Sequence, residues 1–142
     1  MSGYVLHMDE LVVEVPEGFQ DHSVQALEWR PDPDTRVTLT IGREPRKNDE
    51  GLEDAASRVM AALARRVASF KEDEPLPLEI DLPVVTRRAR FRHEGELVYR
   101  HIAFVDLEDR LVIVSASSPT KRRDLADEVL MSALRSARVR ER

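Results

Sequence analysis

The sequence predicts an α+β fold, with a mostly antiparallel sheet and two main helices. The first observation is the order of the predicted elements, which runs strands, helix, strands, helix. The second is that short turn signals separate the later strands, as in a series of antiparallel hairpins. The third is the length of 142 residues, which suits one hydrophobic core. We therefore expect residues 1–142 to form a single domain.

Three strands are predicted in the N-terminal third of the chain. Residues 11–15 form a short apolar run that ends at a Pro-Glu-Gly turn, and residues 23–30 are rich in strand formers. Residues 36–42 alternate strictly between two faces. The core face consists of Val37, Leu39 and Ile41. The opposite face, which is small, weakly polar and available to another molecule, consists of Thr38, Thr40 and Gly42.

Residues 51–70 carry the clearest helical pattern. Their apolar side chains recur every three or four residues and form one stripe: Leu52, Ala56, Val59, Leu63, Val67 and Phe70. Asn48 or Asp49 can cap the start of this helix. A second face carries only small residues, namely Ser57, Ala61, Ala64 and Ala68. Helix propensity explains these alanines, and so does the close approach of another helix or subunit.

The second half of the chain is predicted to form three strands and another helix. A loop with two prolines occupies residues 71–77. The strands are expected at residues 83–93, 96–106 and 110–118, joined by turns at 94–95 and 108–109. Ser118 followed by Pro119 is the pattern of a helix start. The apolar face of the last helix consists of Ala126, Val129, Leu130, Ala133, Leu134 and Ala137.

Composition and charge exclude several classes of function. A net charge of -5 and an aromatic content of 5% argue against a nucleic-acid-binding surface. We interpret the basic strand that carries Arg87, Arg88, Arg90 and Arg92 as a solvated or ion-paired sheet face. The chain has no cysteine, which excludes disulfides, thiol catalysis and cysteine-ligated metals. The N-terminus lacks the basic region of a secretory signal, and no apolar stretch approaches the roughly 20 residues of a membrane span. We therefore expect a cytoplasmic protein that does not insert into membranes.

No arrangement of residues predicts catalysis. The four histidines, at positions 7, 22, 93 and 101, do not have the spacing of metal ligands. The sequence contains neither a nucleophile elbow nor a glycine loop that could hold a phosphate. Adjacent acidic residues fall in predicted turns, where solvent prevents the pKa tuning that paired catalytic carboxylates need. We expect no enzyme activity, no metal and no cofactor.

Several segments resemble the DcrB-like domain and, within it, the Eag adaptors, the effector-associated chaperones of bacterial type VI secretion. The N-terminal part of the resemblance consists of Tyr4, the apolar strand and proline at residues 11–16, and residues 18–24 with their Asp-x-Ser-Val motif. The remaining parts are the strand end at residues 41–44, the long helix that closes on Phe70, and the hairpin segments at residues 99–101 and 110–117. Together they cover essentially the whole chain in order and spacing.

The resemblance implies an α/β sandwich of the Mog1/PsbP type that acts as a homodimer. Such adaptors shield the N-terminal transmembrane helices of PAAR- or Rhs-type effectors until these are loaded on the VgrG spike. Transferred to the matching positions, the client-binding surface consists of Val24, Ala26, Thr38, Thr40, Gly42, Val59, Ala62, Tyr99 and His101. Family members often bind the client through glutamines on the helix and the later strand. This chain has only Gln20 and Gln25, so arginine, tyrosine or histidine must replace them.

Two alternatives stay open at this point. The first is a DcrB-like module of general cell-envelope or stress function with an unknown ligand, because a shared fold does not fix function. The second is an enzyme whose site contains Tyr99, His101 and neighbouring arginines.

Overall fold

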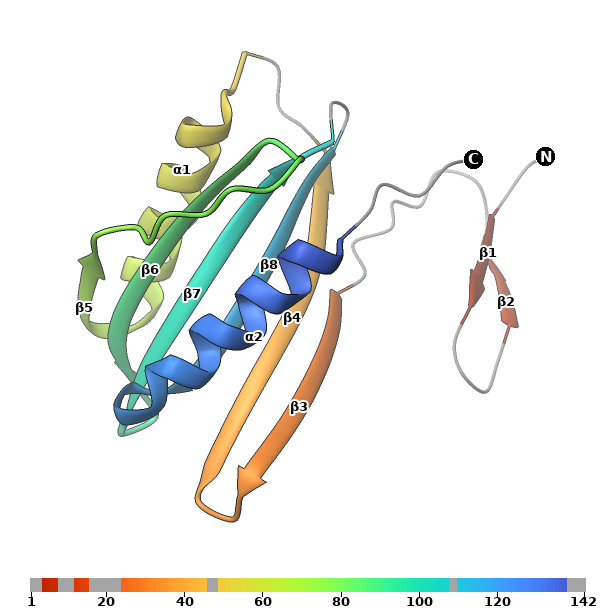
Figure 1. The fold of residues 1–142 in the computed structure, drawn as a ribbon. Coiled ribbons are helices and arrows are strands. Elements are labelled where there is room, and N and C mark those ends of the chain that lie inside the picture. The colour runs from red at the N-terminus through yellow and green to blue at the C-terminus, as the bar shows by residue number, and fades with distance from the viewer. Residues whose placement is uncertain (1–3, 8–11, 16–23, 46–48, 108–109, 138–142) are drawn as a thin grey trace.

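The computed structural model describes residues 4–7, 12–15, 24–45, 49–107 and 110–137. Its main body is a six-stranded antiparallel sheet in the order β3-β4-β8-β7-β6-β5 (Figure 1). The strands are β3 (Val24–Asp32), β4 (Thr35–Pro45), β5 (Ala68–Asp73), β6 (Val84–His93), β7 (Glu96–Asp106) and β8 (Arg110–Pro119). The helices are α1 (Leu52–Arg66) and α2 (Arg123–Ser136), the latter after a 3₁₀ turn at Thr120–Arg122. The strands β1 (Tyr4–His7) and β2 (Val12–Val15) pair with each other. The predicted α+β class is confirmed.

The three long strands β6, β7 and β8 form the predicted meander. β6 pairs with β7 from Val84↔Val105 to His93↔Glu96, and β7 pairs with β8 from Val98↔Pro119 to Asp106↔Leu111. The β6–β7 turn has positive φ at both central residues, 51° at Glu94 and 82° at Gly95. Two consecutive residues with positive φ match the twist of a two-residue hairpin, which explains why the glycine is needed there.

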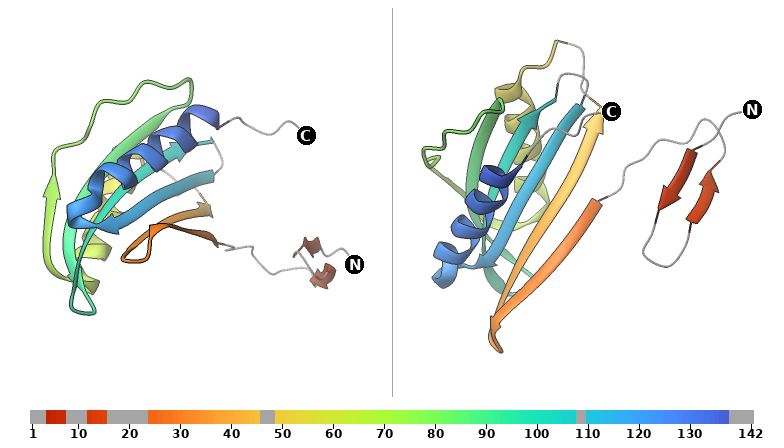
Figure 2. Two further views of the ribbon diagram at one scale, coloured as in Figure 1. Left: turned by 60° about the horizontal axis from the view of Figure 1, so that its bottom comes forward. Right: turned by 45° about the vertical axis from the view of Figure 1, so that its right-hand side comes forward.

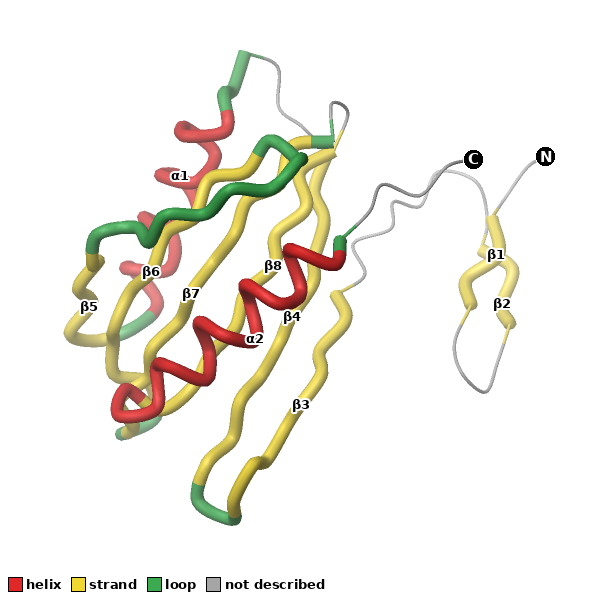
Figure 3. Tube along the Cα trace, viewed as in Figure 1, coloured by secondary structure: helices red, strands yellow, loops and turns green. Residues whose placement is uncertain are grey.

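The two helices cover opposite faces of the sheet, as the two views of Figure 2 and the tube in Figure 3 show. One core lies under α1 and contains Ala55, Ala56, Met60, Leu63, Phe91, Ile102, Phe104 and Leu111. The other lies under α2 and contains Tyr99, Ala103, Val105, Val114, Ala116, Ala126, Leu130 and Leu134. Because side chains alternate along a strand, consecutive residues of β7 contribute to different cores. The predicted core residues Val37, Leu39 and Ile41 face α2.

The first helix is shorter than its apolar pattern predicts. It ends at Arg66, and residues 68–73 form the edge strand β5, which the sequence analysis assigned partly to the helix and partly to a loop. Val67 and Phe70 still pack against the α1 core, so they extend the helical pattern of apolar residues without being helical. Ser69, with φ of 56°, lies where the register of β5 shifts. Ala68 therefore leaves the predicted face of small residues.

The two helices do not begin at the residues predicted to cap them. The N-cap of α1 is Gly51, with no side-chain cap; Asn48 lies outside the described residues, and Asp49 has a positive φ of 62°. Ser118 does not cap α2 either, because it belongs to β8 and its hydroxyl donates to the carbonyl of Pro119, 3.0 Å away. The predicted turn at residues 108–109 also lies outside the described residues.

Candidate functional site

The sheet face that carries α1 is only partly covered. Helix α1 has its main contacts with β5, β6 and β7, whereas α2 lies on the other face. Among the described residues, the main contacts of β3 are with β4. On the α1 face, β3, β4 and the adjoining part of β8 are therefore not covered by either of the described helices. We call this surface the open face and define it by Val24, Ala26, Thr38, Thr40, Gly42, Ser115 and Ser117.

The strand register arranges the open face in rows of small side chains. Ala26 pairs with Thr40, and Thr40 pairs with Ser115, so the three side chains form one row across β3, β4 and β8. The hydroxyls of Thr40 and Ser115 are hydrogen-bonded to each other. Thr38 and Ser117 belong to the next row. Between these strands the central side chains, Ala26, Thr38, Thr40, Ser115 and Ser117, are no larger than threonine, which gives the floor a smooth surface with hydroxyl groups.

Helix α1 forms one border of the open face. Arg58 donates to Oε2 of Glu44 on β4, 3.2 Å away, and to both carboxylate oxygens of Glu50, at 2.9 and 3.2 Å. The hydrogen bond to Glu50 is the largest contribution that raises the pKa of Arg58. Ala62 and Arg66 follow Arg58 at four-residue spacing and therefore lie on the same side of the helix. This side of α1 faces the uncovered strands.

Only part of the predicted client-binding surface lies in one place. Val24, Ala26, Thr38, Thr40 and Gly42 lie together on the open face. Ala62 is half-buried on the bordering side of α1, while Val59 packs into the core beneath the helix.

The structure corrects the assignment of Tyr99 and His101 to this surface. Both side chains are 0% exposed, and they lie under α2 on the opposite face. The physical reason is the period of two along β7, which directs odd-numbered residues toward α2 and even-numbered ones toward α1.

Tyr99 and His101 instead connect β7 to α2 through Asp127. The Tyr99 hydroxyl donates to Oδ1 of Asp127. Nδ1 of His101 lies 2.8 Å from the same oxygen, although the approach lacks hydrogen-bond geometry, and Nε2 has no hydrogen-bond partner among the described residues. Burial lowers the pKa of His101 and raises the pKa of Tyr99, so both side chains are neutral near pH 7. This buried cluster is a structural connection rather than an accessible site.

Three residues of the open face and its border were not predicted from the sequence: Ser115, Ser117 and Arg100. Successive side chains of residues 115–118 in β8 point to opposite faces of the sheet. Only the strand register shows that Ser115 adjoins Thr40 and that Ser117 adjoins Thr38. Nε of Arg100 donates to Ser117 Oγ, 2.9 Å away. The interpretation of the basic strand as ion-paired is confirmed for Arg87 with Glu53 and Glu72, and for Arg90 with Asp73.

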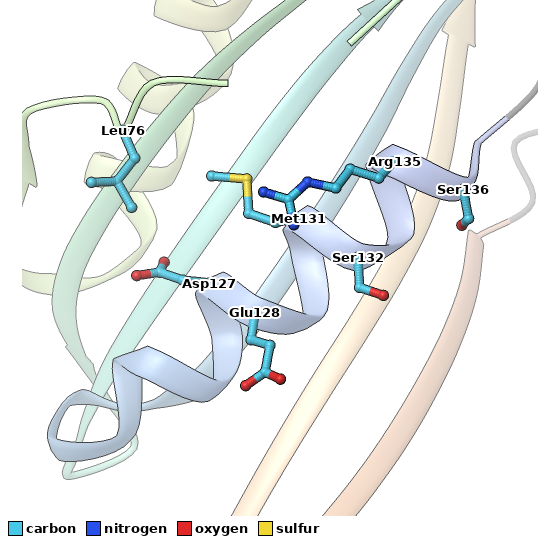
Figure 4. Close-up of a pocket in the computed structure, with 7 residues that line it drawn as sticks. All are labelled: Leu76, Asp127, Glu128, Met131, Ser132, Arg135 and Ser136. Atoms are coloured by element: carbon cyan, nitrogen blue, oxygen red, sulfur yellow. The ribbon is translucent and has the colours of Figure 1, made fainter. Parts of the chain in front are cut away.

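One surface depression lies away from the open face, and another lies at its end. The first follows the outer side of α2 and is lined by Leu76, Asp127, Glu128, Met131, Ser132, Arg135 and Ser136 (Figure 4). The second lies beside the β3–β4 turn and continues the open face, since Thr38 and Ser117 line it. Within the described residues, no cluster of side chains could hold a metal ion. The helices of the described part are also too short or too polar to cross a membrane.

The fold and the open face define an α+β domain whose two helices cover its sheet unevenly. The chain belongs to the DcrB family, whose model matches residues 10–136. A search of curated proteins finds no significant match. A crystal structure of PA94 from Pseudomonas aeruginosa, a protein of unknown function, has the same fold, with a TM-score of 0.78. The alignment covers 99% of each chain at 15% sequence identity.

Proposed function

We propose that this protein is a cytoplasmic chaperone of the Eag type, which binds N-terminal transmembrane helices of a type VI secretion effector and helps to load it on the VgrG spike. The observation that carries the proposal is the open face. Five of the nine residues that the resemblance selects lie together on it, on the face of the sheet opposite α2 and beside the strands that α1 covers. The proposed activity is binding, without catalysis, metal or cofactor.

The dimensions of the open face suit one helix. Neighbouring strands lie about 4.8 Å apart, so β3, β4 and β8 together provide a floor about 10–14 Å wide. An α-helix with its side chains is about 10–12 Å in diameter. One client helix therefore matches the width between α1 and the edge of the sheet.

The chemistry of the open face suits an apolar helix that carries occasional polar groups. Small side chains permit close approach of a helix backbone, as they do between helices inside a membrane. The hydroxyls of Thr38, Thr40 and Ser117 can hydrogen-bond to polar client groups that would otherwise be unsatisfied. Val24, which is 64% exposed at the rim, offers apolar contact. A membrane helix left unshielded in the cytoplasm would aggregate or insert prematurely.

The proposal includes a homodimer. Leu27 and Trp29 are 57% and 48% exposed on edge strand β3, on its other face. A second copy that covers them would remove this apolar surface from water. Sedimentation velocity should show a dimer for the wild type and a shift toward monomer for Trp29→Glu. A monomeric wild type would rule out this part of the proposal.

The test of client binding is a tagged pull-down from the native host cells, with mass spectrometry of the bound proteins. The expected result is one large protein with an apolar N-terminal region. Ala26→Asp should abolish its recovery, because Ala26 is exposed and the substitution places a charge on the floor without disturbing the core. Ser132→Asp, on the outer side of α2, is the matched control and should retain recovery. Equal recovery with both variants would contradict the proposal.

A DcrB-like module of the cell envelope is the second candidate. The family match favours it because the match covers the domain as a whole and singles out no secretion-specific feature. Fractionation distinguishes the two candidates. Recovery from the periplasm would support the envelope module, and recovery from the cytoplasm together with an effector would support the adaptor.

A further inference from the structure

Arg100 is a largely buried cation that no carboxylate of the described residues neutralises. The alternation of β7 directs its side chain toward the α1 face of the sheet, where it borders the open face. Among the described residues, its contacts are the hydroxyl of Ser117, 2.9 Å from Nε, and the ring of Phe91, whose centroid is 5.2 Å from Cζ. These contacts occupy Nε and one face of the guanidinium. No hydrogen bond from either Nη group to another described residue is found.

Two other arginines on this face are paired with carboxylates. Arg58 has Glu44 and Glu50, and Arg87 has Glu53 and Glu72. Arg100, in contrast, is acted on by another positive charge. Burial lowers the pKa of Arg100, and the positive charge of Arg66 lowers it further. Arg66 lies in the last turn of α1, at the border of the open face, and no ion pair holds it among the described residues.

The acid in the same cross-strand row cannot neutralise Arg100. The row runs through Glu28, Thr38, Ser117 and Arg100. Glu28 lies three strands away, a distance of about 14 Å at the usual strand spacing. It is also bound by Arg30 at 2.9 Å and approached by Arg36 at 3.9 Å. Arg100 and Arg66 therefore leave an uncompensated positive charge beside a floor that is otherwise neutral.

We propose that Arg100, together with Arg66, recognises a carboxylate, and that the preferred client is an apolar helix that carries an aspartate or glutamate. This inference rests on the proposed function, because it assumes that a helix occupies the open face. Such a helix would lie over Ser117 and meet the free Nη groups of Arg100, which can bind a carboxylate through two hydrogen bonds. An acidic residue in an apolar segment is costly to bury unless it is paired. In this site the buried guanidinium of Arg100 and the client's carboxylate would neutralise each other.

The test uses synthetic Leu/Ala helical peptides with uncharged polar flanks that carry Asp, Asn or Leu at the centre. Fluorescence anisotropy measures their affinity for the full-length protein. The wild type should bind the Asp peptide at least about tenfold more tightly than the Asn peptide at low salt, as expected for charge-assisted hydrogen bonds. Raising the salt should reduce this preference. Equal affinity for the Asp and Asn peptides would overturn the inference.

The variants separate this site from the open face as a whole. Arg100→Gln should lose the preference for Asp but still bind the Asn peptide. Arg66→Gln, at an exposed position that folding tolerates, should weaken the preference in part. Arg123→Gln removes the same charge at an exposed position on α2 and should keep the full preference. If none of the three peptides bound the wild type, the proposed function itself would fail. Binding of all three without preference would refute only the carboxylate site.

Discussion

Removal of the Tyr99 hydroxyl tests whether the buried cluster under α2 is structural. Tyr99→Phe keeps the ring and opens no cavity, but it removes the hydrogen bond to Asp127. A hydrogen bond to a charged acceptor contributes about 1.5–3 kcal/mol. The Asp127 side chain is 24% exposed and can recruit water, so the lower end applies. We expect a loss of about 1.5 kcal/mol in the free energy of unfolding.

Urea unfolding followed by circular dichroism measures this loss, and the midpoint should fall while the m-value stays constant. A double-mutant cycle with Asp127→Asn should show that the two substitutions are coupled. Binding of the Asn peptide should be unchanged, because Tyr99 lies on the face opposite the open face. Unchanged stability, or a loss of peptide binding at unchanged stability, would refute this reasoning.

Three further predictions concern the cores and the floor. Burial lowers the pKa of His101 below its usual 6.5 in spite of Asp127, while Arg88 adds to the lowering. The unfolded chain therefore binds the proton more tightly, so stability should fall as the pH drops below about 6.5, and His101→Gln should weaken that dependence in urea titrations. Leu130→Ala, at a fully buried position under α2, should cost about 2–5 kcal/mol in the same assay. Gly42→Ala should raise the free energy of unfolding by about 0.4–1 kcal/mol, because alanine restricts the unfolded chain more than glycine does. Its Cβ would lie at an ordinary 3.5 Å from Cγ2 of Val24, so any change in peptide affinity would come from the altered floor and not from a loss of stability.

The strand alternation explains both the success and the error in predicting the site. Residues 36–42 alternate clearly enough for sequence reasoning to separate the core side chains from Thr38, Thr40 and Gly42. On β7 both faces are covered, because α1 packs on one and α2 on the other. Its sequence therefore lacks a polar side, and nothing in it indicated that Tyr99 and His101 face α2. The carboxylate that the Tyr99 hydroxyl contacts lies 28 residues away, so the connection to Asp127 depends on tertiary structure.

The end of α1 shows a second limit of periodicity. Val67 and Phe70 continue the spacing of a helical stripe, yet the chain leaves the helix at Arg66 and enters β5. Pairing with β6 determines that this segment is a strand, because such long-range pairing overrides local helix propensity. The sequence also could not predict that Arg100 has no carboxylate partner among the described residues, since this depends on which carboxylates the neighbouring arginines bind.

The central claim is that the open face holds an apolar helix. The most direct measurement places a photo-crosslinking residue at Ala26 in one variant and at Ser132 in another, and exposes each to the Leu/Ala peptide that carries Asn. Our account predicts a crosslink to the apolar part of the peptide from position 26 and none from position 132. Crosslinking from position 132 alone, or from neither position, would contradict it.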